Sequence, residues 1–174
     1  MAGIRLADRL LVVGCSDPLL IARLAVKTGL TGRAYALDER EPLVAAARDV
    51  AAREGALIET ATGPWTTFPL DTDTFDVAIV RNVLPYLPED RRGACLDEVR
   101  RVLRPGGRCL VIDGGGRTGL AALTRRGSVP RDYRSQGGAV QIFTALGFKA
   151  ARILAERDGF VFAEAVKAMV PSEN

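Results

Sequence analysis

The sequence contains no histidine, and this absence removes several kinds of site at once. Neither a Cys/His zinc site nor a histidine-based catalytic triad can be built from it. The three cysteines, Cys15, Cys95 and Cys109, are an odd number without close spacing, so we expect reduced thiols in a cytoplasmic protein and no metal site. No apolar run approaches the ~20 residues that a membrane-spanning helix needs.

What is present is the composition of a globular protein. Of the 174 residues, 48% are hydrophobic and 26% are charged. A chain of this length can bury roughly 70% of its unfolded surface, so its core needs no disulfide or metal. The net charge of +3 comes mostly from arginine and is too small to indicate nucleic-acid binding. We expect one domain over residues 1–174, with its core at about 8–168.

Short β-rich apolar runs alternate with helical periodicity, a pattern that predicts a doubly wound α/β fold. One helix is expected to begin after Asp17, a capping residue, and to end at Gly29. The other helices are expected over 41–54, 88–103 and 139–146, and the strands over 10–14, 33–38, 57–60, 75–80, 108–113, 151–157 and 160–167. The glycine- and arginine-rich segment 114–138 interrupts the alternation.

The last two predicted strands are joined only by Asp158-Gly159, the signal of a two-residue β-hairpin. Parallel neighbours need a long crossover connection, so these two strands must be antiparallel. The sequence therefore predicts a mostly parallel seven-stranded sheet with one antiparallel strand.

Three runs, 75–80, 82–84 and 96–107, have an order and spacing typical of a known family. The sequence resembles the class I S-adenosylmethionine-dependent methyltransferases, particularly the small-molecule branch related to ubiquinone and menaquinone biosynthesis enzymes. The resemblance covers about residues 8–168. It implies a Rossmann-like methyltransferase fold, S-adenosylmethionine as cofactor and a small-molecule substrate.

The resemblance also shows where the cofactor site departs from the family pattern. The acid of the first strand falls on Val12, and the three glycines of the following turn fall on Gly14, Ser16 and Pro18. Only the first glycine is retained, and we keep Gly14, Cys15 and Ser16 as the turn that faces the cofactor. Cys15 can alternatively be a small buried filler.

A charge near this turn is supplied by Asp17, which either replaces the lost acid or only caps the helix. The acid expected to accept from the adenine amino group is missing too, because Pro64 stands at its position. The backbone N–H of Trp65 could still meet an adenine ring nitrogen, and its indole either covers the base or belongs to the core.

Asp38 is the best-preserved cofactor residue that the resemblance implies. It ends the second strand, where a carboxylate accepts from both ribose hydroxyls, although it could also be a solvated acid. Glu39 is either a second cofactor contact or a surface residue. Arg81, just past the fourth strand, would oppose a cationic sulfonium unless an acid pairs with it.

For the substrate, the candidates are Asn82, Tyr86 and Asp113, which follow the fourth and fifth strands. Asn82 could equally cap a turn. Without histidine, a proton would be taken by Asp113, Tyr86, Tyr133 or solvent. The basic segment 117–134 is either an anion-binding lip or a solvated loop.

Two hypotheses of function follow. The first is a methyltransferase that acts on a small molecule, and the second is a catalytically inactive methyltransferase-fold protein that serves as a binding partner or scaffold, with a homodimer or a partner protein as its assembly. A nicotinamide-dependent dehydrogenase is disfavoured because its phosphates need the glycine-rich turn. Nucleic-acid methylation is disfavoured because the spacing after Asn82 does not fit the motif of amino-methylating relatives.

Overall fold

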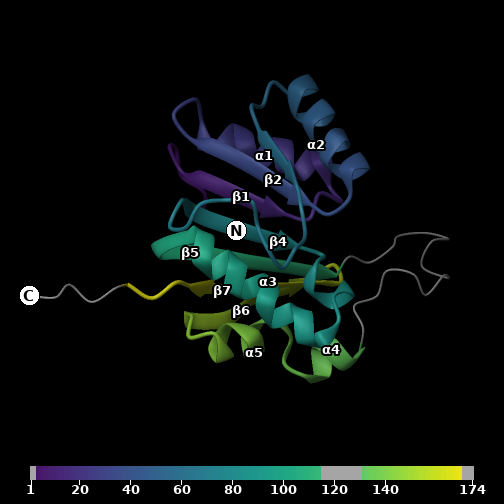
Figure 1. Ribbon diagram of the computed structural model, residues 1–174, viewed down its shortest axis with the longest axis vertical. Helices are drawn as coiled ribbons and strands as arrows, with labels where there is room; N and C mark the ends of the chain where they lie inside the picture. Colours follow the sequence, from purple (N-terminus) through teal and green to yellow (C-terminus); the bar gives the residue numbers. More distant parts are fainter. Residues whose placement is uncertain (1–2, 115–130, 170–174) are drawn as a thin grey trace, which may run out of the picture.

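A computed structural model describes residues 3–114 and 131–169, which form a seven-stranded sheet in the order β3-β2-β1-β4-β5-β7-β6 (Figure 1). The strands are β1 (Arg9–Val13), β2 (Arg33–Asp38), β3 (Glu59–Thr62), β4 (Phe75–Arg81), β5 (Leu103–Gly114), β6 (Lys149–Arg157) and β7 (Phe160–Val166). The helices are α1 (Pro18–Thr28), α2 (Glu41–Arg53), α3 (Glu89–Val102), α4 (Arg131–Ser135) and α5 (Gly138–Ala145), with a short 3₁₀ turn η1 (Leu84–Tyr86).

The centre of the sheet is β1, which pairs in parallel with β2 on one side and with β4 on the other. The chain first winds outward through β2 to β3 and then returns to continue through β4 and β5. The winding direction therefore reverses between β1 and β4. In doubly wound sheets this is where ligands bind, beyond the carboxyl ends of the strands.

The last strand confirms the predicted antiparallel element. β7 lies between β5 and β6 and is antiparallel to both. The two residues of the β6–β7 turn, Asp158 and Gly159, both have positive φ (52° and 78°), as a type I′ hairpin turn requires. The mostly parallel seven-stranded sheet with one antiparallel strand is thus the architecture that the sequence predicted.

Helices cover both faces of the sheet. Alternate residues of β1 point to opposite faces: Leu11 and Val13 join the core under α3 and α5, whereas Leu10 and Val12 join the core under α1 and α2. All four side chains are buried, which explains why this strand reads as a continuous apolar run. Figure 1 shows α3 crossing one face of the sheet, with α5 and α4 beside it.

Two predicted strands differ most from the strands observed. The third strand was expected over 57–60 but covers Glu59–Thr62, because Leu57 is 84% exposed and pairing with β2 begins at Tyr35 and Glu59. Apolar character is a weak guide at this edge of the sheet.

The fifth strand was expected from Arg108, but it begins at Leu103, opposite Phe75. The helix before it ends at Val102, close to the predicted end. A register shift follows between the pairs Phe75–Leu103 and Val77–Arg108, so the Pro-Gly-Gly run lies inside an irregular strand.

In the described part of the segment 114–138, residues 131–135 form a helix that the sequence did not predict, α4. Residues 115–130, with most of the predicted basic lip, lie outside the described residues.

Candidate active site

The turn after β1 keeps one glycine because the geometry demands it. Gly14 has φ of +95°, and a Cβ at this position would lie 2.3 Å from the backbone oxygen of Arg81. Its N–H donates to the carbonyl of Leu37 at 2.8 Å. The turn is therefore pressed against the ends of β2 and β4, where no larger residue fits. Ser16, two residues further on, is exposed.

Asp38 ends β2 with its side chain completely buried. Its carboxylate accepts four hydrogen bonds. Oδ2 accepts from the backbone N–H of Cys15 at 2.8 Å, which ties the strand end to the turn after β1. The other three come from Arg40: its backbone N–H and Nε donate to Oδ1 at 3.0 Å, and Nη2 donates to Oδ2 at 3.3 Å. The carboxylate of Asp38, which was expected to accept from the ribose hydroxyls, therefore already accepts hydrogen bonds from donors of the protein itself.

Arg40 was not singled out from the sequence, although it lies only two residues beyond Asp38. Its guanidinium Cζ lies 5.7 Å from the centroid of the Trp65 ring, a cation–π distance. The Arg40 side chain is 56% exposed, whereas that of Asp38 is inaccessible. Arg40 thus covers the buried carboxylate from the solvent side, and this arrangement is visible only when the strand end and the loop that carries Trp65 are brought together.

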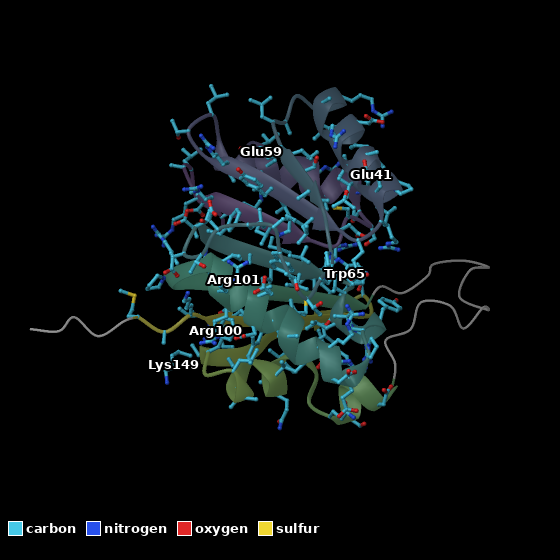
Figure 2. The ribbon with its side chains drawn as sticks, viewed as in Figure 1. Glu41, Glu59, Trp65, Arg100, Arg101 and Lys149 are labelled. Atoms are coloured by element: carbon cyan, nitrogen blue, oxygen red, sulfur yellow. The ribbon has the colours of Figure 1, made fainter. Side chains whose placement is uncertain are left out.

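Trp65 belongs to the core cluster under α3, and its indole Nε1 is buried without a hydrogen-bond partner among the described residues. Its backbone N–H, the group predicted to meet adenine, donates to Oε1 of Glu39 at 3.0 Å. Figure 2 shows Trp65 toward the edge of the sheet where the parallel strands end. Glu39 is therefore a contact of the loop 63–74, in addition to being a neighbour of Asp38.

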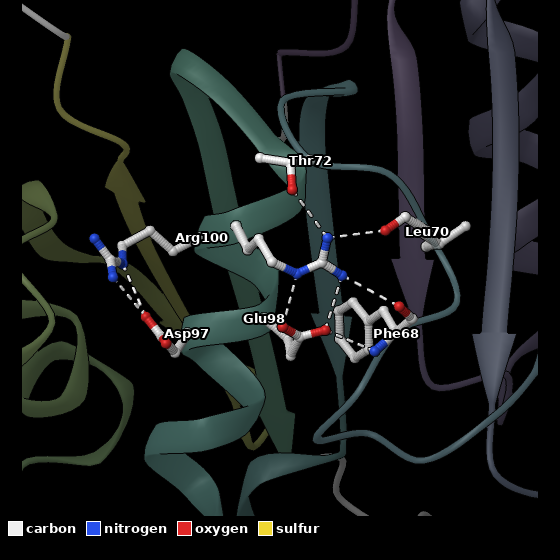
Figure 3. A network of polar contacts seen from close by, with 7 residues as sticks. Phe68, Leu70, Thr72, Asp97, Glu98 and Arg100 are labelled. Atoms are coloured by element: carbon white, nitrogen blue, oxygen red, sulfur yellow. Dashed lines mark hydrogen bonds and ion pairs between the residues drawn. The ribbon is translucent and has the colours of Figure 1, made fainter.

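Glu98 and Arg101 of α3 fasten that loop to the helix (Figure 3). Oε2 of Glu98 accepts from the Phe68 N–H at 2.7 Å. The Arg101 guanidinium donates to the carbonyls of Phe68 and Leu70 and pairs with Glu98 at 2.8 Å. These hydrogen bonds lower the pKa of Glu98 and raise that of Arg101. Two residues of the quoted 96–107 motif thus hold the loop that carries Trp65.

The charge of Arg81 has an acidic partner, as the cofactor hypothesis required. Its Nη2 lies 3.0 Å from Oδ2 of Asp17, and its guanidinium lies 5.3 Å from the Phe160 ring centroid. The other oxygen of Asp17 accepts from the Leu20 N–H at 3.0 Å. Asp17 therefore caps α1, as one of the two sequence alternatives expected, and its other oxygen pairs with Arg81; its replacement of the lost acid stays a prediction.

The remaining candidates have distinct surroundings. Asn82 has φ of +50° and accepts from the Gly114 N–H at 2.9 Å, so its side-chain oxygen joins the ends of β4 and β5. Tyr86 is exposed in η1. Cys15 is fully buried, and burial with the neighbouring Asp38 charge raises the pKa of its thiol to about 12. It has the environment of an inert filler.

Asp113, near the end of β5, forms a second buried polar group. The Tyr133 hydroxyl of α4 donates to its Oδ2 at 2.7 Å. Arg92 of α3 lies over the tyrosine ring, with its guanidinium carbon 5.0 Å from the ring centroid. Burial raises the pKa of Asp113 to about 7, opposed by the Tyr133 hydrogen bond and the Arg92 charge. The sequence named Asp113 and Tyr133 separately; only the structure joins them.

Arg92 is the other residue that sequence reasoning missed. It is buried, and its Nε donates to the carbonyls of Leu84 and Leu87, both at 3.1 Å. A buried arginine in a charge-rich helix looks like any surface arginine in the sequence, so no local signal could have found it. It fixes η1 against α3 and supports Tyr133.

The described residues contain neither a cluster of metal ligands nor a membrane-spanning helix. Within 3–114 and 131–169, no group of three or more His, Cys, Asp or Glu side chains is arranged to hold a metal ion. In the same ranges, no helix has the length and apolar character needed to cross a membrane.

Comparison with known proteins places the chain in a family. The sequence pattern of the methyltransferase domain family matches residues 10–107, more than half of the chain, and the chain belongs to this family. It is also similar to the ubiquinone/menaquinone biosynthesis C-methyltransferase UbiE of Hydrogenovibrio crunogenus, with 30% identity over 122 residues. That match covers 65% of this chain and 44% of the relative, so the chain spans less than half of the relative's length.

Solved structures show the same fold at low sequence identity. A SAM-dependent methyltransferase from Aquifex aeolicus superimposes with a TM-score of 0.76 at 20% identity, over 95% of this chain and 85% of that one. A chain of the complex that contains the Haloferax volcanii Trm112 methyltransferase activator gives a TM-score of 0.70 at 16% identity, over 97% and 86% of the two chains.

Proposed function

We propose that the protein is an S-adenosylmethionine-dependent methyltransferase that acts on a small molecule. Membership of the methyltransferase domain family supports the cofactor. The observation that carries the proposal is Asp38, a buried carboxylate at the end of β2 that is bonded to the turn after β1. When bound, the cofactor supplies an activated methyl group, and the chain contributes binding, orientation and exclusion of water.

The residues at this edge fit the nucleoside part of the cofactor if the Arg40 side chain moves away from Asp38. The ribose hydroxyls would take the place of the Arg40 donors on Asp38, while the Cys15 N–H keeps the carboxylate in position. Arg40 is half-exposed and can turn toward solvent. The backbone of the turn formed by Gly14, Cys15 and Ser16 would face the cofactor, with Glu39 and Trp65 beside the base.

The pairing of Arg81 with Asp17 supports the same proposal, because it offsets a positive charge that would repel a sulfonium. Asn82, Tyr86 and Asp113 stay proposed substrate contacts. Of the acceptors for a proton, Asp113 is the strongest candidate, since burial brings its pKa to about 7, near the operating pH of a general base. The three cysteines are free and buried, which supports a cytoplasmic location.

Calorimetric titration of the full chain with S-adenosylhomocysteine tests the proposal. We expect saturable binding, weakened on the order of tenfold in Asp38→Asn, because the amide accepts fewer hydroxyl hydrogen bonds than the carboxylate. Asp97→Asn is the matched control, since this exposed acid on α3 pairs only with Arg100 among the described residues. No heat at millimolar ligand would end the methyltransferase assignment.

A second candidate function is a methyltransferase-fold protein without catalysis that binds a partner or a second copy of itself. The occupied Asp38 carboxylate favours it, because every ribose hydrogen bond must displace one made by Arg40. The Haloferax volcanii structure, in which a methyltransferase activator is bound in a complex, supports a protein partner but gives no support to the loss of catalysis. The same titration separates the two functions: a chain that binds no cofactor leaves this one standing.

A further inference from the structure

A cavity of about 190 Å³ lies between the half of the sheet formed by β5, β7 and β6 and the helices α4 and α5. Half of its twelve lining residues are aliphatic: Val111, Ala139, Val140, Ile153, Val161 and Ala163. The wall of the cavity includes Asp113, near the carboxyl end of β5. This is the edge of the sheet at which Asp38 and Arg81 also lie, since all three end parallel strands.

Asp113, one of the residues that line this cavity, has an unsatisfied oxygen. Asp113 is only 3% exposed, and its Oδ1 has no hydrogen-bond partner among the described residues. Its other oxygen is used by the Tyr133 hydroxyl. A buried carboxylate oxygen without a donor is costly, and native structures usually supply that donor from protein, water or ligand.

None of the described charged side chains around the cavity donates a hydrogen bond to Oδ1 of Asp113. Arg92 lies over the Tyr133 ring, donates to the carbonyls of Leu84 and Leu87 and to Gln136, and pairs with Asp132 at 3.7 Å. Arg134 and Glu156 also line the cavity, but both are exposed and of opposite sign. Neither of them gives Oδ1 a donor.

We infer that this cavity binds a small apolar molecule that carries one hydrogen-bond donor, a hydroxyl or an amine, directed at Oδ1 of Asp113. The aliphatic walls would hold the body of the molecule and the carboxylate would fix its orientation, the usual division of labour in small-ligand sites. An apolar cavity of about 150 Å³ is large enough for benzene, so this one can take a single ring with one polar substituent.

The inference rests on the proposed function in one respect: it names this class of molecule as the methyl acceptor. Alcohols and amines are both nucleophiles whose donor hydrogen a carboxylate can accept. The binding site itself does not depend on the cofactor, so it can be tested in the cofactor's absence.

The experiment uses three probes of nearly equal size, benzylamine, benzyl alcohol and toluene, added to the full chain without cofactor and followed by amide chemical shifts. We expect the two donor-bearing probes to shift Val111, Ala139 and Ala163 and to bind several-fold more tightly than toluene. Asp113→Asn should weaken benzylamine on the order of tenfold, because the amide is uncharged. If Asp113→Asn loses more affinity for benzylamine than for benzyl alcohol, the amine is the preferred donor. If it loses the same affinity for both, the hydroxyl and the amine are equivalent donors.

Asp97→Asn is the matched control, since it removes the same charge from an exposed carboxylate on α3 that does not line the cavity. We expect it to change benzylamine binding less than twofold. Tyr133→Phe provides a second variant that keeps the Asp113 charge, and it should retain benzylamine binding. Equal affinity of wild type and Asp113→Asn, or no shifts at the cavity residues with any probe, would overturn the inference. In either case measured cofactor binding would leave the proposed function intact.

Discussion

At the scale of single residues, Arg40 decides how readily the nucleoside site opens. Three donors of this side chain and its backbone occupy Asp38, and two of them are on the guanidinium. An arginine held this way competes with ribose hydroxyls for the same two oxygens. It also offsets a buried negative charge that would be costly if left unpaired.

Replacing Arg40 therefore separates its competition with the ribose hydroxyls from its compensation of the Asp38 charge. In Arg40→Ala we expect S-adenosylhomocysteine to bind several-fold to tenfold more tightly by calorimetry, because no side chain has to be displaced from Asp38. The midpoint of thermal unfolding should fall, since the carboxylate loses its counter-ion. Arg48→Ala is the control, an exposed arginine of α2 that bonds Thr60. Weaker binding in Arg40→Ala would mean that Arg40 contacts the ligand instead of competing with it.

Asp113 makes the stability of the protein depend on pH. Burial raises its pKa to about 7 in the folded chain, against the lowering effects of Tyr133 and Arg92, while the unfolded chain has an ordinary aspartate. Between these two values the folded state holds the extra proton, so the free energy of unfolding falls as pH rises, by at most about 1.4 kcal/mol per pH unit. Above pH 7 the carboxyl is ionised in both states and the dependence ends.

The comparison of wild type with Asp113→Asn isolates this contribution. We expect the stability of wild type relative to the variant to fall from about pH 4 to about pH 7, measured by urea unfolding at a series of pH values. The nearby Cys95 thiol, whose pKa burial raises to about 12, does not titrate in this range. A difference that is constant with pH would show that Asp113 is ionised throughout.

At the scale of elements, α3 holds the loop 63–74 through Arg101. In Arg101→Ala we expect the free energy of unfolding to fall by about 1–3 kcal/mol, because Glu98 and the carbonyls of Phe68 and Leu70 lose their donor. Trp65 is the only tryptophan, so its fluorescence reports directly on that loop. The emission should shift to the red as the buried indole gains water.

Arg100 is the matched control in this helix. It pairs with Asp97 three residues earlier, and both side chains are about half-exposed (Figure 3). Exposed pairs of this kind contribute ~0–1 kcal/mol. Arg100→Ala should leave the Trp65 fluorescence unchanged. Equal red shifts of the emission in Arg100→Ala and Arg101→Ala would contradict the prediction that Arg101 in particular holds the loop 63–74.

At the scale of the whole molecule, one continuous sheet lies between two cores. Each core depends on the same strands, because alternate residues of β1 and β4 fill opposite faces. Loss of the sheet therefore exposes both cores together. We expect a single cooperative transition in urea, with the same midpoint for Trp65 fluorescence and far-UV circular dichroism. Two separate midpoints would mean that the core under α3 and α5 melts independently.

The sequence by itself determined most of the elements, their alternation and the terminal hairpin, because the signals for these are local. Strand β2 was predicted at the residues it occupies, α1 was bounded by Asp17 and Gly29, and the hairpin followed from Asp158-Gly159. Periodicity, caps and turn residues act within a few positions along the chain. Edge strand β3 was misplaced because its position depends on pairing with β2, whatever its own apolar content.

Only the tertiary structure decided which polar groups meet. That Arg40 turns back onto Asp38, that Arg81 finds Asp17, and that Tyr133 reaches Asp113 all depend on side-chain directions at the edge of the assembled sheet. The buried position of Arg92 likewise follows from how α3 packs against η1 and α4. Composition and spacing carry no record of such contacts, because burial, which makes each of these charges costly or useful, exists only once the chain has folded.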